Sequence, residues 1–237
     1  MMRSVLAIAG RELRSYFASP IFYVVTAAFL VVTGYLFTLI LFYSREASLR
    51  GVFANMSILL IILGPALTMR LLAEEHRTGT IELLLTSPVR DFEVVLGKFL
   101  AGVGLLLAML AITLYYPLLL FLYGSPEKGS IIGGYVGVIL LGAVFIAIGL
   151  FASSLTANQI VAAVLTFMML LLLWLIGAAG DFASPPLADI FRYMAVDTYY
   201  SDFTRGVVDT KAVVYYLSVV AVFLFATVRS LETRRWR

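Results

Sequence analysis

Six long apolar runs dominate the sequence, and none of them has an aspartate, glutamate, lysine, arginine or histidine near its middle. A transmembrane helix needs about 20 consecutive apolar residues, with a range of about 17–25. The runs lack the alternation of apolar and polar residues that is typical of membrane β-strands, so they predict helices. The sequence therefore predicts an all-α integral membrane protein that forms a single domain over residues 1–237. The six predicted spans are Ile21–Tyr43, Val52–Ala73, Phe99–Tyr123, Ile131–Leu155, Ile160–Gly180 and Ala212–Val228.

The composition excludes the soluble classes of protein. Of the 237 residues, 62% are hydrophobic and 13% are charged, against about 45–50% and about 25% in an ordinary soluble domain. Such a chain cannot cover a water-facing surface with polar groups, and it is too apolar to be disordered. The absence of cysteine also excludes disulfides, thiolate metal ligands and a cysteine nucleophile.

Lysine and arginine are distributed unequally between the connections. One side of the predicted membrane collects 11 of the 17 lysine and arginine residues, and the other side collects six. Because cytoplasmic connections carry the excess of positive charge, both termini are predicted to lie in the cytoplasm. This topology signal accounts for the formal net charge of +3. No nucleic-acid motif accompanies it, so no nucleic-acid partner is expected.

Residues 3–18, ahead of the first run, carry apolar side chains at intervals of three and four. The basic residues of this segment lie elsewhere on the helical wheel. We expect a short amphipathic helix in the cytoplasmic membrane interface, with its basic side toward anionic headgroups. A merely basic tail would not need the regular spacing. Ser19 and Pro20 then predict a cap and a first-turn proline for the first span. The apolar positions are Val5, Leu6, Ala9, Leu13, Tyr16 and Phe17.

Ionisable groups are missing from the middle of the spans. Ion-coupled transporters usually place such groups on their pathway, so a secondary transporter is disfavoured, although a sodium site of carbonyls and hydroxyls stays open. The sole histidine, His76, lies in a loop, which leaves no histidine-based catalytic or zinc site within the bilayer. Gly97–Lys98 lacks the earlier glycine of a phosphate-binding loop, because Phe92 stands there. No enzyme activity and no cofactor are predicted for this chain.

Small residues and prolines within the spans predict how the helices pack and bend. Gly133 and Gly137 are spaced for the close approach of a neighbouring helix. Pro65 and Pro117 predict kinks in the second and third spans.

The connection between the second and third runs predicts a short helix outside the membrane. Gly79 is a plausible end for a preceding helix, Thr80 is an N-cap, and Ser87–Pro88 forms a stop. The helix would carry Ile81 and two leucines on one side. Such an apolar surface is normally covered. Two interpretations stay open at this point, a helix that lies on the membrane surface and a docking site for a soluble subunit.

The sequence resembles a known family in three separated places. EEHRTGTIELLLTSP at residues 74–88, followed by LGKF at 96–99, is similar to the cytoplasmic signature of type-2 ABC exporter permeases. DFTRGVVD at 202–209 with YYLS at 215–218, and RSLETRRW at 229–236, are similar to the gliding-motility-associated members. The resemblance extends over essentially the whole chain and includes the six-span topology.

The resemblance implies a half-transporter in the inner membrane of a prokaryote. Residues Thr80–Ser87 would be the coupling helix that seats in a cleft of a separate ABC ATP-binding subunit, and Arg3–Ala18 would be an interface helix that braces the same subunit. ATP and magnesium would bind to that partner. A second permease copy or a related permease, membrane lipids and an accessory membrane subunit are the other implied partners. The implied docking residues are Glu74, Glu75, Arg77, Thr80, Ile81, Glu82, Leu84 and Leu85.

The connection between the fifth and sixth runs carries two apolar stripes at helical spacing. Neither stripe is long enough to span a bilayer, but two short helices could dip into the outer leaflet. A solvated loop with an apolar underside is the alternative. The resemblance implies an external re-entrant hairpin over residues 185–209 that acts as a gate. The implied gate residues are Leu187, Phe191, Met194, Tyr199, Tyr200 and Phe203.

Three functions follow from these observations. The first is the permease subunit of an ATP-driven exporter, which the coupling signature favours. The second is a membrane scaffold of an ABC-type or gliding-motility assembly that transmits force without moving a substrate. The third is a secondary transporter, which the uncharged spans disfavour.

Overall fold

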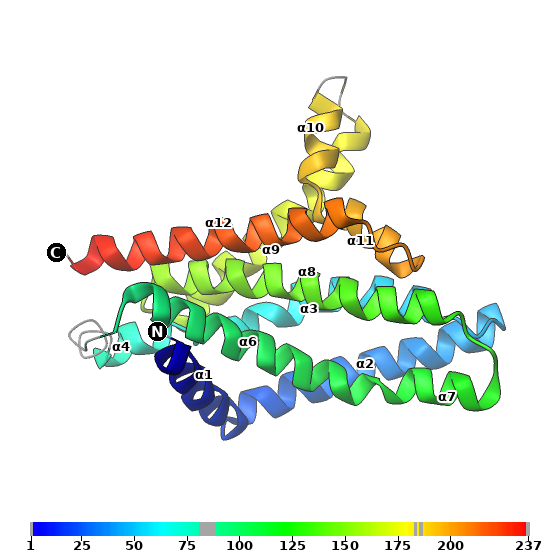
Figure 1. The fold of residues 1–237 in the computed structure, drawn as a ribbon, viewed down its shortest axis with the longest axis horizontal. Coiled ribbons are helices and arrows are strands. Elements are labelled where there is room, and N and C mark those ends of the chain that lie inside the picture. The colour runs from blue at the N-terminus through cyan, green and yellow to red at the C-terminus, as the bar shows by residue number, and fades with distance from the viewer. Residues whose placement is uncertain (1, 81–88, 183, 185–186, 236–237) are drawn as a thin grey trace.

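The computed structural model describes residues 2–80, 89–182, 184 and 187–235, and within these it contains helices and no strand (Figure 1). The helices are α1 Met2–Phe17, α2 Pro20–Ser44, α3 Arg50–Thr68, α4 Ala73–Thr78, α6 Asp91–Thr113, α7 Tyr115–Tyr123, α8 Lys128–Leu155, α9 Gln159–Phe182, α10 Leu187–Met194, α11 Val196–Thr204 and α12 Thr210–Arg235.

The long helices run back and forth along the longest axis of the molecule, which is horizontal in Figure 1. α1, α4 and both ends of the chain lie at one end of this bundle, which we call the α4 end, whereas α7 and α11 lie toward the opposite end, which we call the α11 end. An even number of crossings brings the two termini to the same side, as the sequence predicts.

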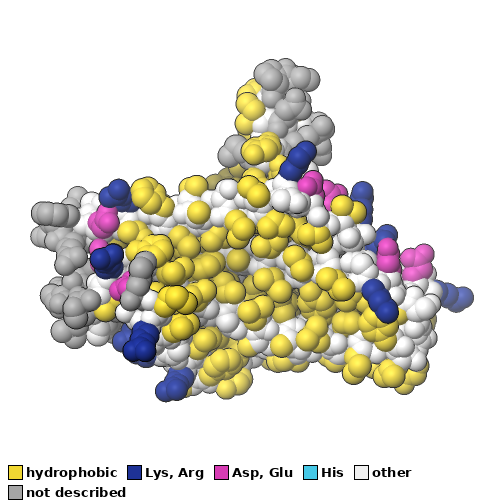
Figure 2. Space-filling model, viewed as in Figure 1, with side chains coloured by type: hydrophobic (Ala, Val, Ile, Leu, Met, Phe, Trp, Pro, Cys, Tyr) yellow, Lys and Arg dark blue, Asp and Glu magenta, His cyan; other side chains and the backbone are white. Residues whose placement is uncertain are grey.

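Among the described residues, six helical stretches are long and apolar enough to cross a membrane, which confirms the predicted all-α fold with six candidate spans. Figure 2 shows hydrophobic side chains across the middle of one face and charged side chains gathered toward the two ends. This arrangement matches an apolar layer between two polar surfaces. The stretches are Pro20–Ser44, Arg50–Thr78, Asp91–Tyr123, Lys128–Leu155, Gln159–Gly177 and Thr210–Thr233.

α8 is the central helix of the bundle. In its most apolar stretch, 72% of the residues are buried, against 17% in α9 and 22% in α12. Glycines on α8 allow neighbours to approach: a Cβ atom at Gly142 would lie 2.4 Å from the side chain of Leu106, and one at Gly134 would overlap the ring of Phe53. α8 therefore holds together α3 and α6, which pack on different sides of it.

The third run bends where the sequence predicts a kink. α6 ends at Thr113 and α7 begins at Tyr115. Pro117 has no N–H to donate to the carbonyl four residues earlier, which belongs to Thr113. The hydroxyl of Tyr135 on α8 donates to this carbonyl oxygen at 3.0 Å. A side chain of the central helix thus satisfies the group that the proline leaves free.

The second run ends earlier than its hydropathy predicts. α3 stops at Thr68 rather than at Ala73, and a turn leads into α4. Ser153 of α8 fixes this turn: its hydroxyl oxygen accepts the N–H groups of Leu72 at 3.0 Å and Ala73 at 2.8 Å, and its O–H donates to the carbonyl of Met69 at 3.1 Å. The predicted kink at Pro65 lies three residues before this break, but the hydrogen bonds from Ser153, a residue far along the chain, leave no local sequence signal.

Candidate functional site

The helix predicted at the N-terminus is present as α1, and it packs along α6. Val5, Ala9 and Tyr16 of the apolar stripe are buried, whereas Leu6 and Phe17 of the same stripe remain exposed. Part of the stripe therefore faces the protein, and part is open to the surroundings.

Two glycines of α6 make this contact close. A Cβ atom at Gly97 would lie 2.8 Å from Cγ2 of Ile8, and one at Gly104 would lie 3.0 Å from Cδ2 of Leu13. The hydroxyl of Tyr16 donates to the carbonyl oxygen of Leu67 on α3 at 3.0 Å, which fixes the end of α1 against a second helix.

Lys98 of α6 is the centre of a buried charge cluster at the α4 end. Its side chain is 1% exposed, and its Nζ lies 3.1 Å from Oε1 of Glu12 on α1 and 2.9 Å from Oε1 of Glu75 on α4. Arg11 lies at the rim, with Nη2 at 3.4 Å from Glu12 and 3.7 Å from Glu75. One lysine thus joins three separate helices.

Arg70 forms a second set of contacts beside this cluster. Its Nε and Nη2 donate to the two carboxylate oxygens of Glu74 at 2.7 and 2.9 Å. Its Nη1 donates to Oγ of Ser19 at 2.6 Å. Ser19 is the N-cap residue of α2 and Pro20 opens the helix, as the sequence predicts, but the Ser19 side chain makes no cap hydrogen bond and accepts from Arg70 instead. We call the two sets together, comprising Glu12, Ser19, Arg70, Glu74, Glu75 and Lys98, the α4 junction.

The two glutamates of the α4 junction have different electrostatic environments. Four of the six residues of α4 are ionisable, so this helix lies beyond the apolar part of its span. Hydrogen bonds from Arg70 hold the pKa of the Glu74 carboxyl below its usual range. Burial raises the pKa of Glu75, and the charge of Lys98 opposes this rise. Glu75 is therefore costly to keep charged unless Lys98 remains beside it.

The predicted docking residues divide into three groups. Glu74 and Glu75 are turned into the α4 junction and bind cations of their own chain. Arg77 and Thr80 are exposed beyond it. Gly79 ends α4 with φ 71°, a left-handed conformation that favours glycine, as the sequence predicts. The remaining members, Ile81, Glu82, Leu84 and Leu85, lie outside the described residues, and the predicted helix at Thr80–Ser87 stays a prediction.

Four members of the α4 junction, namely Glu12, Ser19, Arg70 and Lys98, were not among the residues predicted for the site, and Lys98 and Glu12 are the two at its buried centre. The predicted third span begins at Phe99, so Lys98 was expected at a membrane boundary, whereas α6 begins at Asp91 and places Lys98 well inside a helix. Glu12 is the single acid of a basic segment. The sequence signal for this ion pair was therefore the lone acid Glu12 on α1, together with Lys98, a lysine on the apolar side of α6.

The predicted gate residues lie on two short helices, α10 and α11, whose packing differs. Tyr200 and Phe203 of α11 are buried, and the hydroxyl of Tyr200 donates to the carbonyl oxygen of Phe53 at 2.7 Å. Tyr199 is half-buried and stacks on a tyrosine of α12. On α10, which projects from the bundle in Figure 1, Leu187 is exposed and Phe191 is half-buried. The structure does not describe the side chain of Met194.

Comparison with known families gives a match over most of the chain. The family described as "ABC-2 family transporter protein" matches residues 32–226, which is most of the chain. The chain belongs to the ABC-2 transporter family. The matched segment includes Glu75 and Lys98 of the α4 junction and begins within α2, after Glu12. A search among proteins of curated function found no match.

Membership of the ABC-2 family makes this chain a multi-pass membrane protein and a permease component of an ABC transporter. Such a component works with an ABC ATP-binding subunit. The α4 junction is then of interest in this ABC-2 permease, because it fixes α4, the helix that precedes residues 81–88.

Gly133 and Gly137 bring α11 of this ABC-2 permease against α8. A Cβ atom at Gly133 would lie 2.5 Å from the carbonyl oxygen of Phe203, and one at Gly137 would lie 2.7 Å from Cβ of the same residue. The close neighbour of this glycine pair is thus a short helix between the last two spans.

We expect Gly137→Ala to destabilise the protein by about 1–3 kcal/mol, because the new methyl group must displace Phe203. Gly129→Ala is the matched control on the same helix, since a Cβ atom there meets nothing within 4 Å. Thermal unfolding of the purified variants measures the difference. Equal unfolding temperatures for the two variants would show that the contact tolerates a methyl group.

Proposed function

We propose that this chain is the permease subunit of an ATP-driven exporter and works as a pair, either with a second copy or with a related permease. ABC ATP-binding subunits dock at the α4 end, on residues 80–87 together with Arg77. The observation that carries the proposal is the α4 junction. Lys98 and Arg70 hold α4 to α1, α6 and the start of α2, so a force applied just after α4 reaches three elements at once.

The ion pairs suit this transmission because they are buried. Lys98 is 1% exposed, and its two glutamate partners are 14% and 15% exposed. Separating them would leave charges in a medium that solvates them poorly. α1, α4 and α6 would therefore move as a unit when ATP closes the two ATP-binding subunits, and the two permeases would rock between inward-facing and outward-facing states. ATP and its magnesium ion belong to the partner in this proposal.

The proposal places the α4 end in the cytoplasm and the protein in the inner membrane of a prokaryote. The excess of lysine and arginine in the connections at the α4 end supports this orientation. The finer resemblance to gliding-motility permeases, carried by residues 202–209, 215–218 and 229–236, is part of the same proposal.

Single cysteines test docking and orientation together, because the natural chain has none. Arg77→Cys places a thiol on an exposed site at the α4 end, and Ser125→Cys places one on an exposed site between α7 and α8. We expect a thiol-reactive photocrosslinker at position 77, and not at position 125, to join the chain to a co-expressed ABC ATP-binding subunit from the same genome. In intact cells, a membrane-impermeant maleimide should label position 125 alone.

Maleimide labelling tests the orientation, and crosslinking tests the docking site, independently of each other. Labelling of position 77 in intact cells would overturn the orientation. Correct labelling without a crosslink from position 77, or with equal crosslinking from position 125, would overturn the docking site. Thermal unfolding of both variants controls for damage to the fold.

A further inference from the structure

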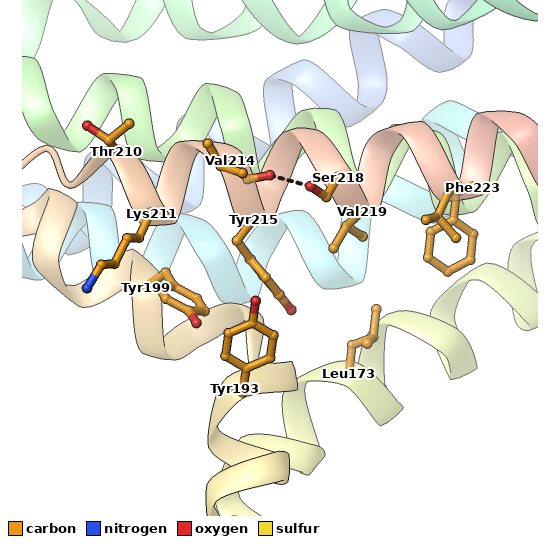
Figure 3. Close-up of a pocket in the computed structure, with 11 residues that line it drawn as sticks. Leu173, Tyr193, Tyr199, Thr210, Lys211, Val214, Tyr215, Ser218, Val219 and Phe223 are labelled. Carbon is orange, nitrogen blue, oxygen red and sulfur yellow. Dashed lines mark hydrogen bonds between the residues drawn. The ribbon is translucent and has the colours of Figure 1, made fainter.

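A cavity of about 710 Å³ lies between α9, α10, α11 and α12 (Figure 3), and none of its lining residues belongs to the α4 junction. Its volume falls in the range of about 300–1,000 Å³ that is usual for small-molecule sites. Most of its wall is apolar. The residues that line it include Leu173, Val214, Val219, Val222 and Phe223.

Polar groups gather at only one end of this cavity. Lys211, the second residue of α12, lies there with three tyrosines, one each from α10, α11 and α12 (Figure 3). The rings of Tyr199 and Tyr215 stack with centroids 4.6 Å apart, and Tyr193 lies 6.1 Å from Tyr215 in an edge contact. Tyrosine and lysine at the end of a span are typical of the interface between hydrocarbon and water.

The rest of the wall offers little to a polar ligand. The hydroxyl of Ser218 donates to the carbonyl oxygen of Val214 at 2.7 Å, so it is used within its own helix. Beyond it the cavity is lined by Val219, Val222 and Phe223. The cavity is therefore amphipathic along α12, with its polar part at the α11 end.

The length of the cavity matches one leaflet of a bilayer. Lys211 and Phe223 are separated by about 18 Å along α12, at 1.5 Å per residue. Half of the hydrocarbon core of a bilayer is about 15 Å thick. Val214 and Val222 are 57% and 63% exposed, so a molecule already in the leaflet could enter from the side.

We propose that this cavity binds one anionic phospholipid from the leaflet at the α11 end. The acyl chains lie along Val219, Val222 and Phe223, and the phosphate lies beside Lys211 among the tyrosine rings. The nearest acid in the sequence, Asp209, has one carboxylate oxygen 2.9 Å from the backbone N of Lys211, which donates to it as the helix begins. The ammonium group of Lys211 is the cation that the described lining residues offer to the phosphate. The proposal needs only the membrane location of the chain and does not depend on ATPase docking.

Native mass spectrometry of the purified full chain tests the site with phosphatidylglycerol and phosphatidylcholine that carry identical acyl chains. We expect Lys211→Gln to weaken phosphatidylglycerol binding about fivefold, as for the loss of one lysine at a membrane surface, and to leave phosphatidylcholine binding unchanged. Lys128→Gln, an exposed lysine at the start of α8, is the matched control. An equal effect of both variants would overturn the assignment of the headgroup site.

A second pair of variants tests the apolar part. Val219→Phe fills the cavity and should weaken the binding of both lipids. Leu217→Phe lies on the same helix but outside the cavity lining, and it should weaken the binding of neither lipid. Wild-type protein with a phosphatidylglycerol that carries a photoactivatable acyl chain should crosslink within α9 or α12. Crosslinks elsewhere, or full lipid binding by Val219→Phe, would overturn the proposal and leave the cavity to another occupant.

Discussion

Replacing Lys98 by methionine is expected to destabilise the protein by about 3–5 kcal/mol, the usual cost of removing one partner from a buried ion pair. Methionine fills a similar volume, so the loss is electrostatic and not a cavity effect. Two carboxylates that each lie within 3.1 Å of the lysine Nζ would then lose this buried cation and keep the exposed Arg11 at the rim, at 3.4 and 3.7 Å. Thermal unfolding of the full chain in detergent or nanodiscs measures the effect.

The partner variants separate the charge effect from loss of packing. Glu12→Gln leaves Lys98 paired with Glu75 at 2.9 Å, so its effect should be smaller than that of Lys98→Met. The triple variant Glu12→Gln, Glu75→Gln, Lys98→Met has no buried charge at the centre of the cluster. It should recover most of the lost stability, because neutral replacement of a whole buried ion set is often tolerated.

A lysine on the surface provides the matched control. Lys128 begins α8 and is exposed, so Lys128→Met should change stability by less than about 0.5 kcal/mol. If Lys98→Met unfolds at the wild-type temperature, or if the triple variant is no more stable than the single one, the cluster does not hold the three helices together.

The six spans follow from the sequence because crossing a membrane depends on local composition. Twenty apolar residues identify a span whatever packs against it. The ends of the helices are different, because contacts from remote residues set them. Ser153 on α8 makes hydrogen bonds to the turn that follows the end of α3 at Thr68. No pattern within residues 52–73 predicts this contact.

The α4 junction could be predicted only in part, for the same reason. The family signature singles out Glu74 and Glu75, but as docking residues and not as partners of Arg70 and Lys98, and the apolar spacing predicts α1. Neither pattern shows that α1 packs on α6 through Gly97, which is what brings Glu12 to Lys98. The rule that charges belong at membrane surfaces also placed Lys98 at a boundary, although two carboxylates compensate for its burial inside α6.

Replacing Ile81, Leu84 and Leu85 together by serine is expected to weaken association with the ABC ATP-binding subunit by at least about a hundredfold, because apolar anchors in a docking cleft dominate such interfaces. Co-purification of the two subunits from membranes measures the loss. The matched control replaces three exposed apolar residues at the α11 end by serine, namely Ile132, Val207 and Val208. This control should leave co-purification unchanged.

The same triple-serine variant distinguishes the two interpretations of residues 80–87. A helix that merely lies on the membrane surface would lose lipid contact when its leucines are removed, and the ATP-binding subunit would stay bound. A docking helix would lose the subunit while the chain still inserts into the membrane. The unfolding temperature of the isolated chain separates this variant from Lys98→Met, because the ion pairs of the α4 junction are made by Glu12, Arg70, Glu74, Glu75 and Lys98, which this variant keeps. Loss of the ATP-binding subunit without loss of stability would therefore assign subunit binding to residues 81–85. The stability of the helix packing at the α4 end would then depend on Lys98.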